Sequence, residues 1–292
     1  MKPSAYISLF LKFVLAMTVA IVSASILWGI PPAKNSVVKS FCDDYTFSHG
    51  DGGVSFRDLR ETLQPSTGDL SVDAGRNGGV KVRGEDRSDV MVRACVQTWA
   101  KTDAEAKAIA SSIKISTGSL IKADGPNEEK WSVSYEVLVP RNTDLRLNAH
   151  NGGIAISNVD GRLEFETMNG GVSLTDVAGD VRGRTTNGGV NVSLSGNTWK
   201  GSGLDVQTTN GGVKISLPES YAANIETGTV NGGFNSNIPA LNVTTENVKG
   251  DEWGRSRSKK INTAINGGGA PLKISTTNGG VMIRTTESEK KY

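Results

Sequence analysis

The 292-residue chain has few of the side chains on which catalysis and metal binding most often depend. It contains two histidines and two cysteines, and only 6 % of its residues are aromatic. These residues form no Cys/His cluster for a zinc site, and they leave little for Ser-His or Cys-His catalysis. We therefore expect no metal and no cofactor, and a protein that is not an enzyme.

An excess of charge of one sign is also lacking. The chain carries 32 basic and 30 acidic residues; Lys2 and Lys12 precede residue 31, whereas the first acidic residue is Asp43. Without these two lysines, the remainder has 30 basic and 30 acidic residues and is formally neutral. A nucleic-acid binder would show a basic patch or a high pI, so no nucleic-acid partner is expected. A hydrophobic content of 37 % argues against wholesale disorder.

One long hydrophobic run lies near the N-terminus. Residues 13–30 form an uncharged apolar run of 18 residues behind the two lysines, and Pro31-Pro32 ends it. A secretory h-region has about 7–15 residues and a membrane span about 17–25, so the run lies on the border between them. Residues 1–30 are therefore a signal anchor that contacts the membrane through residues 13–30, or a signal peptide cleaved after Ala24. Both alternatives export the rest of the chain.

Export would bring Cys42 and Cys95 into an oxidising compartment. Two cysteines can pair there, although no rule of spacing requires that they do. A Cys42–Cys95 disulfide and two buried free thiols both remain open.

Glycine is abundant, and much of it belongs to an internal repeat. Of the 35 glycines, sixteen belong to eight Asn-Gly-Gly triplets. The triplets at Asn151, Asn169 and Asn187 are spaced by 18 residues, and the apolar residues around them keep the same phase. Such self-similarity predicts a repeat array. The triplets begin at Asn77, Asn151, Asn169, Asn187, Asn210, Asn231, Asn266 and Asn278, and Asp51 begins a ninth, weaker copy.

Each repeat unit predicts two short strands. Its apolar residues alternate, as in Ile154-Ala155-Ile156, which is the period of a β-strand. Asn-Gly-Gly forms one of the turns, because φ > 0 is inexpensive for glycine. We expect an all-β fold, a β-solenoid (β-helix-like) of stacked parallel coils; an antiparallel β-meander fits the same units. The residues predicted to point into one core are Ile154, Ile156, Leu163, Phe165, Val172, Leu174, Val190, Val192, Val213 and Ile215.

The domain organisation follows from where the repeat begins and where its phase is lost. A β-rich cap precedes the array, with one helix over 103–113 because Thr102 and Glu105 have the spacing of a capping box. The expected segments after residues 1–30 are a linker (31–40), the cap (41–140), the regular β-repeat array (141–234), an irregular basic insertion (235–265), a final coil (266–286) and a tail (287–292).

Charged residues on the outward face of the array have two interpretations. If the coils stack in parallel, Glu164, Arg182 and Asp205 align, with Glu166 in the next column. The alternating signs predict an ion ladder. The alternative is a paired-carboxylate active site formed by Glu164 and Glu166. The step after Asp205 would bring Glu226 beside it, a contact between like charges that the ladder does not explain.

Three aromatic residues suggest a ligand-binding edge. Trp199 and Tyr221 lie in enlarged loops at the same position of two consecutive repeat units, and Trp253 lies in the irregular region that follows. An exposed row of aromatic rings would suit a glycan or another envelope component. The alternative is that each ring folds back and fixes its own loop, since large side chains bury well.

Two stretches carry a family resemblance. The run VLVPRNTDLRLNAHNGGIAISNVDGRLEFETMNGGVSLTDVAGDVRGRTTNGGVNVSL, followed by INGGGAPLKISTTNGGVMIR, resembles the bacterial adhesin-like β-strand-repeat family, domain of unknown function 4097. The resemblance covers roughly residues 133–286. It implies a β-solenoid-like fold, export or membrane attachment, and no established catalytic residues.

We therefore expect a non-enzymatic β-repeat protein of the cell envelope, structural or adhesin-like. It would be a bacterial membrane-anchored protein with an extracytoplasmic domain, or a periplasmic or secreted one. Two alternatives remain: a β-helix enzyme that acts on polysaccharide, and an ectodomain accessory of envelope signalling.

Overall fold

The computed structural model describes residues 41–44, 53–241, 244–247 and 257–286. The expected N-terminal segment and linker, the first two residues of the Asp51 triplet copy, Trp253 and the tail lie outside these residues. The chain divides into two units, residues 1–39 and 40–292, and all the described residues belong to the second. No helix within the described ranges is long and apolar enough to cross a membrane.

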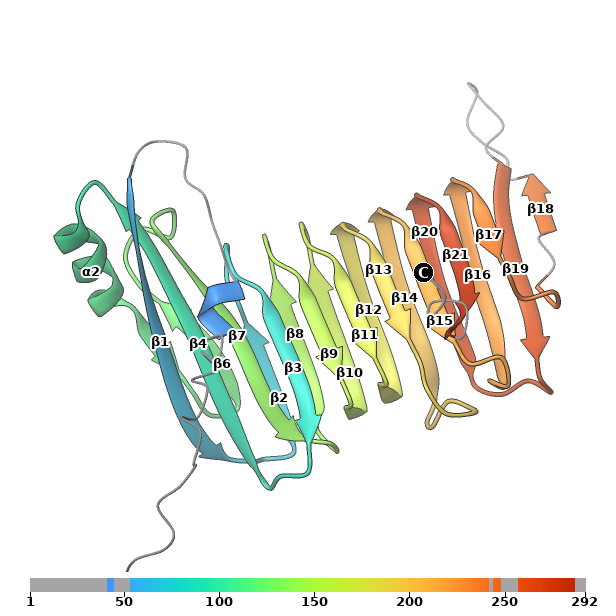
Figure 1. The fold of residues 1–292 in the computed structure, drawn as a ribbon, viewed down its shortest axis with the longest axis horizontal. Coiled ribbons are helices and arrows are strands. Elements are labelled where there is room, and N and C mark those ends of the chain that lie inside the picture. The colour runs from blue at the N-terminus through green and yellow to red at the C-terminus, as the bar shows by residue number, and fades with distance from the viewer. Residues whose placement is uncertain (1–40, 45–52, 242–243, 248–256, 287–292) are drawn as a thin grey trace, which may run out of the picture. The chain divides into compact units, whose positions relative to one another are not determined.

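Two β-sheets form this unit (Figure 1). Alternate side chains of each strand point to opposite faces of a sheet, so the alternating apolar residues gather on one face. In spatial order, the ten-stranded sheet contains β1 (Val54–Pro65), β4 (Asp89–Ala100), β7 (Trp131–Pro140), β3 (Val80–Glu85), β9 (Ile154–Ser157), β11 (Val172–Thr175), β13 (Val190–Ser193), β15 (Val213–Leu217), β21 (Val281–Thr285) and β17 (Phe234–Ser236). The eleven-stranded sheet contains β18 (Thr244–Asn247), β19 (Arg257–Ile265), β16 (Ala223–Asn231), β20 (Pro271–Asn278), β14 (Gly203–Asn210), β12 (Ala178–Asn187), β10 (Asp160–Thr167), β8 (Asp144–Ala149), β2 (Asp69–Asp73), β6 (Leu120–Asp124) and β5 (Lys114–Ser116).

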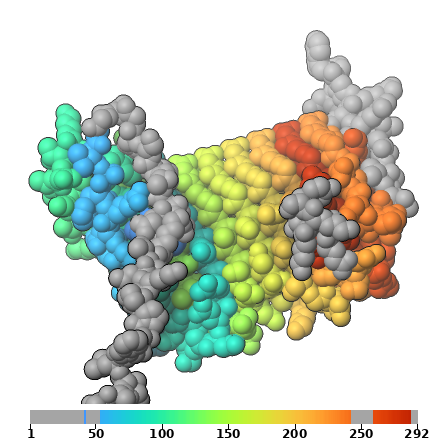
Figure 2. Space-filling model, in the orientation of Figure 1, coloured from blue at the N-terminus to red at the C-terminus, as the bar shows by residue number. Residues whose placement is uncertain are grey.

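Neighbouring strands of the array run parallel and in register. Leu163 of β10 faces Val181 of β12, and Val172 of β11 faces Val190 of β13. In each of these two pairs the partners are 18 residues apart, which is the spacing of the sequence repeat. Successive coils appear as bands of colour along the molecule in Figure 2. This arrangement is consistent with a β-solenoid and differs from the alternative antiparallel meander. Among the described strands, antiparallel pairing is confined to the cap and to β16, β19 and β18.

The core predicted from the alternation is confirmed. All ten residues expected to point inward are buried, and they belong to one hydrophobic cluster. The same cluster continues into the cap through residues such as Val133 and Tyr135 of β7. Cap and array therefore share one core.

Helix α2 (Asp103–Ser112) packs against β1 and β4 in the cap. Thr102 caps its N-terminus, where the side-chain oxygen accepts a hydrogen bond from the Glu105 amide at 3.2 Å. At the other end, the Arg60 guanidinium donates to the carbonyl oxygens of Ala110 and Ile113 at 2.7 and 2.6 Å. These bonds satisfy backbone groups that a helix leaves without partners at its ends.

The final coil, formed by β20 and β21, is inserted between two coils that precede it in the sequence. β20 lies between β14 and β16, and β21 lies between β15 and β17 (Figure 1). Residues 235–265, expected as an irregular insertion, contribute β18, β19 and part of β17. β19 pairs antiparallel with β16 and buries Ile261 and Ile265. An antiparallel strand outside the 18-residue phase gives no repeat signal, which is why the sequence pattern missed it.

Candidate functional site

Seven Asn-Gly-Gly triplets stack at one corner of the coils, and their asparagines form a continuous ladder. At each step the side-chain Nδ2 donates to Oδ1 of the asparagine in the adjacent coil, at 2.8–3.0 Å. In spatial order the members are Asn77, Asn151, Asn169, Asn187, Asn210, Asn278 and Asn231. The eighth triplet, at Asn266, is a turn in which all three residues have left-handed φ.

The glycines of the ladder triplets are required for close packing. Contrary to the expectation of φ > 0, none of them has a left-handed backbone. A Cβ on Gly170 would overlap the carbonyl oxygen of Gly152 in the adjacent coil, and the first glycine of each ladder triplet is in the same position. The second glycine has more room: a Cβ on Gly171 would meet the Gly189 carbonyl oxygen at 3.5 Å, an ordinary contact.

A buried threonine two residues before a ladder asparagine ties that coil to its neighbour. The Thr185 hydroxyl donates to the carbonyl oxygen of Gly170 at 2.7 Å, which satisfies a polar group inside the core. The same bond recurs, at 2.7–2.8 Å, from Thr167, Thr208, Thr229 and Thr276. The recurring motif Thr-x-Asn-Gly-Gly is the feature of the sequence that could have pointed to this corner. The threonine–carbonyl bond and the asparagine–asparagine bond both join different coils, so they depend on how the coils stack.

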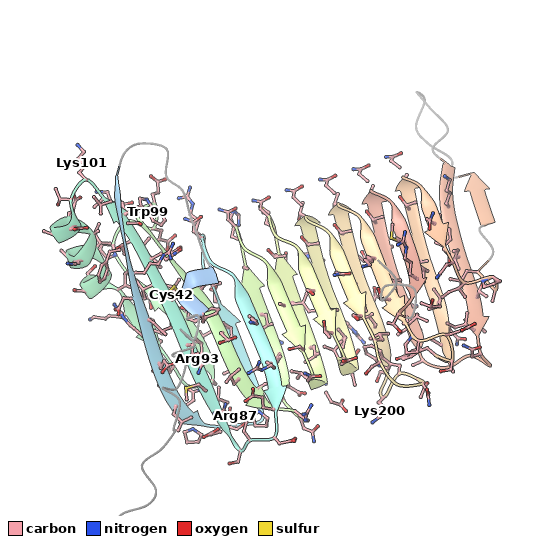
Figure 3. The ribbon with its side chains drawn as sticks, viewed as in Figure 1. Cys42, Arg87, Arg93, Trp99, Lys101 and Lys200 are labelled. Atoms are coloured by element: carbon pink, nitrogen blue, oxygen red, sulfur yellow. A yellow bond between two sulfur atoms is a disulfide. The ribbon has the colours of Figure 1, made fainter. Side chains whose placement is uncertain are left out.

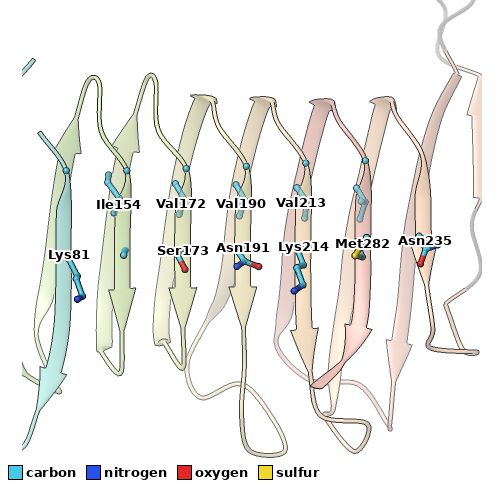
Figure 4. Close-up of a pocket in the computed structure, with 18 of the residues that line it drawn as sticks. Lys81, Ile154, Val172, Ser173, Val190, Asn191, Val213, Lys214, Asn235 and Met282 are labelled. Atoms are coloured by element: carbon cyan, nitrogen blue, oxygen red, sulfur yellow. The ribbon is translucent and has the colours of Figure 1, made fainter. Parts of the chain in front are cut away.

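The second glycines of the ladder triplets form the floor of a groove on the outer face of the ten-stranded sheet (Figure 4). The groove has a volume of about 1050 Å³ and crosses β3, β9, β11, β13, β15, β21 and β17. It exists because the floor has no side chains, whereas the next outward position on every strand has one. These wall residues are Lys81, Ala155, Ser173, Asn191, Lys214, Met282 and Asn235.

Among the described residues that line the groove, the ionisable side chains are those of Lys81 and Lys214. Lys81 Nζ lies 3.1 Å from Glu136 Oε1, and Arg93 Nη1 lies 3.1 Å from the other oxygen of the same carboxylate. Burial raises the pKa of Glu136, but the contacts with Lys81 and Arg93 outweigh this effect and hold the pKa below its ordinary value. Arg93 also pairs with Glu61 at 2.8 Å. A chain of ion pairs therefore joins β3, at one end of the groove, to β7, β4 and β1 of the cap.

The eleven-stranded sheet carries the expected alignment of charges on its outer face. Glu164 faces Arg182 in register, as stacked coils predict. The ion pairs join Glu164 to Arg146 at 3.0 Å and Glu166 to Arg184 at 2.8 Å. Both carboxylates therefore bind an arginine, as in an ion ladder. Within the described ranges, no group of three or more His, Cys, Asp or Glu side chains is placed to hold a metal ion.

The expected aromatic edge is not present at Trp199 and Tyr221. Their exposed fractions are 5 % and 2 %, so both rings lie in the protein interior. Trp199 Nε1 donates to the Gly179 carbonyl oxygen at 3.0 Å, and burial raises the pKa of Tyr221 to about 12. Each ring packs against the core at its own enlarged loop, because burying the large apolar surface of the ring stabilises the fold more than leaving it in water. Trp253 lies outside the described residues.

Cys42 and Cys95 form a disulfide, with their Cα atoms 5.2 Å apart. Cys42 belongs to the short helix η1 (Phe41–Asp44; Figure 3), and Cys95 lies in β4. Phe41 and the two cysteines form a small buried cluster. The bond therefore fastens η1 to the cap.

Parallel coils, an asparagine ladder and a groove built from repeated positions define a β-repeat protein. The chain belongs to the Toastrack DUF4097 family, whose pattern matches residues 61–284. The match includes most of the cap and begins well before residue 133, where the resemblance in the sequence starts.

Two solved structures are similar to this chain. One is a candidate cell adhesion protein from Clostridium sporogenes ATCC 15579, with 12 % identity and a TM-score of 0.39, over 78 % of this chain and 100 % of that one. The other is a candidate adhesin from Bacteroides fragilis NCTC 9343, with 8 % identity and a TM-score of 0.31, over 79 % of this chain and 97 % of that one. No curated protein matches the sequence.

Proposed function

We propose that this protein is a non-enzymatic, exported β-repeat protein of the bacterial cell envelope that acts as a structural or adhesin-like binding module. The groove on the ten-stranded sheet is the observation that carries the proposal. Seven strands contribute the same positions to one continuous surface, lined by backbone, aliphatic, hydroxyl, amide and lysine groups. Groups of these kinds hold a ligand and do not form an acid–base pair.

Two features support export. The Cys42–Cys95 disulfide suits an oxidising compartment, since thiols stay reduced in the cytosol. The apolar run over residues 13–30 has the length of a membrane anchor or of an unusually long signal sequence. A membrane-anchored protein with an extracytoplasmic domain and a periplasmic or secreted protein are both consistent with these features.

The ion pairs that Glu164 and Glu166 each form with an arginine favour a binding module over a polysaccharide-cleaving enzyme. A glycosidase needs one carboxyl group that donates a proton and a second that acts as base or nucleophile. Here both carboxylates bind arginines, at 3.0 and 2.8 Å, on an exposed face. These contacts hold the two groups in the same kind of environment and give neither a separate role.

Fractionation of bacteria that produce the full-length chain tests export. We expect the protein in the membrane or extracytoplasmic fraction, digested by protease added to spheroplasts, with Cys42 and Cys95 alkylated only after reduction. A cytoplasmic marker protein, which should stay undigested, is the control for cell integrity. Recovery of the chain with the cytoplasmic control, with both thiols reactive before reduction, would overturn the proposal.

Incubation with envelope polysaccharide tests the non-enzymatic part. We expect the length of the polysaccharide to stay unchanged with the parent protein and with a Glu164→Gln/Glu166→Gln variant. Shortening of the polymer by the parent that is lost in this variant would instead assign an active site to the eleven-stranded sheet.

A further inference from the structure

We infer that the groove on the ten-stranded sheet binds a linear anionic glycan built of uronic-acid residues, whose chain runs parallel to the asparagine ladder and across the strands. The inference rests on the proposed function, because it names the ligand class of the same binding surface. Three properties of the groove carry it: its repeat distance, the state of its backbone groups and the sign of its charge.

The repeat distance of the groove suits a chain of pyranose rings. Neighbouring strands lie about 4.8 Å apart, so seven strands present the same position along about 29 Å. A pyranose residue in an extended glycan is about as long as one strand spacing, and successive rings can therefore occupy equivalent places. An extended peptide advances about 3.3 Å per residue and does not keep this register.

The floor of the groove offers no free strand edge. The Ile154 amide donates to the Gly171 carbonyl oxygen at 3.0 Å, and an equivalent bond joins each pair of adjacent strands along the floor. A peptide therefore cannot add to the sheet here by backbone pairing, which takes place at sheet edges. What remains is a flat backbone surface for sugar rings, beside the Ser173 hydroxyl and the Asn191 amide, which can bond sugar hydroxyl groups (Figure 4).

The charge of the groove suits an anion. Lys81 and Lys214 lie in its wall four strands apart, about 19 Å, and no carboxylate is among the described residues that line it. Glu136, the partner of Lys81, belongs to β7, and the lysine side chain still has 44 % of its surface exposed. A carboxylate on the sugar ring adds charge without lengthening the repeat. A phosphodiester linkage would extend the repeat beyond one strand spacing.

Calorimetry of the full-length protein with an octamer of β-1,4-linked mannuronic acid tests the inference, with the neutral β-1,4-linked mannose octamer as the matched ligand. Gly171→Leu is the blocking variant. Gly171 lies on the floor, its φ suits any residue, and the space above it is open to the groove. Thr186→Leu is the matched control, since it places the same side chain on the exposed face of the eleven-stranded sheet.

We expect the parent protein to bind the anionic octamer about tenfold more tightly than the neutral one. Gly171→Leu should weaken this binding about tenfold or more, whereas Thr186→Leu should leave it within about twofold. The double variant Lys81→Gln/Lys214→Gln should lose the preference for the anionic octamer, and added salt should weaken binding by the parent. Melting curves establish that each variant is folded; if Gly171→Leu is not, Gly280→Leu on the same floor replaces it.

The inference is overturned if the parent does not bind the mannuronate octamer, or if the floor variant binds it as the parent does. Tighter binding of the neutral octamer, of a phosphodiester-linked polymer or of an acidic peptide would overturn it as well. The experiments on export and on the ligand class can contradict their proposals independently of each other. A cytoplasmic protein that binds the octamer through the groove contradicts the proposed function alone, and an exported protein that does not bind it contradicts this inference alone.

Discussion

Lys273 of β20 forms an ion pair with Glu226 of β16, with Nζ 3.4 Å from Oε2. On its other side Lys273 faces Asp205 of β14 in register. If the coils stacked in sequence order, Asp205 would lie next to Glu226. The inserted strand therefore places a cation between two carboxylates and removes the like-charge contact that the sequence order implies.

Reversal of this charge should destabilise the protein. In Lys273→Glu three carboxylates would face one another across adjacent strands, and we expect the free energy of unfolding to fall by about 1 kcal/mol at low ionic strength. Urea denaturation measures the change. The deficit should shrink in 1 M salt, because the side chains are partly exposed and salt screens them. The neutral control Lys273→Gln should cost less; an equal loss in both variants would mean that charge is not the cause.

The two glycines of one ladder triplet should differ sharply in their tolerance of a methyl group. Gly170→Ala places a Cβ on the Gly152 carbonyl oxygen, so backbone has to move, and we expect a loss of about 3 kcal/mol. Gly171→Ala meets an ordinary contact, and its effect should stay within about 0.5 kcal/mol. Denaturant melts of both variants make the comparison. Similar losses at the two positions would contradict the close-packing explanation for the triplet.

Phe165 and Gly183 fill one layer of the core together. The Phe165 ring occupies the space that a Cβ on Gly183 would need, in the adjacent strand. We expect Phe165→Ala to cost about 3–5 kcal/mol through the cavity it leaves, and Gly183→Ala about 1–3 kcal/mol through overlap with the ring. In Phe165→Ala/Gly183→Ala the methyl group has room, so the double variant should lose less than the sum. Additive losses in a double-mutant cycle would show that the two positions are independent.

The inward residues could be predicted because their identity depends on local alternation. Phe165 and Val190 have the strand period around them, and that period alone assigns them to the core face. The 18-residue spacing likewise predicted the alignment of Glu164 with Arg182. These features need only the chain's own neighbours and the assumption of stacked coils.

Features that depend on which coils meet could not be predicted. Leu272 and Ile225 have the same phase in their units, so the pattern does not show that β20 lies between β14 and β16. The bond from Asn278 to Asn210 follows from that choice, and so does the glycine packing beside it. The burial of Trp199 is a third case, since an enlarged loop can turn its ring inward or outward with the same sequence.

Glu136 should make the stability of the fold sensitive to acid. Burial raises its pKa, but the ion pairs with Lys81 and Arg93 outweigh burial and hold the pKa below the ordinary value of 4.5. In the unfolded chain these contacts are absent. A carboxyl group whose pKa is lower in the folded state contributes stability that is fully present above the unfolded pKa and is lost as the pH falls through the folded pKa.

The free energy of unfolding should therefore decrease as the pH is lowered from about 4.5 through the folded pKa of Glu136, where protonation breaks both ion pairs. At pH 7, Glu136→Gln should be less stable than the parent, because the two cations lose their shared partner. The difference between the two proteins should shrink in acid, since the parent then carries a neutral side chain as well. Urea denaturation from pH 7 to pH 3 measures it. Glu129→Gln is the matched control: its side chain is 72 % exposed, so its ion pair with Arg76 contributes little and the substitution should hardly change the free energy of unfolding at pH 7. A gap between parent and Glu136→Gln that stays constant over the range would contradict a role for the Glu136 ion pairs.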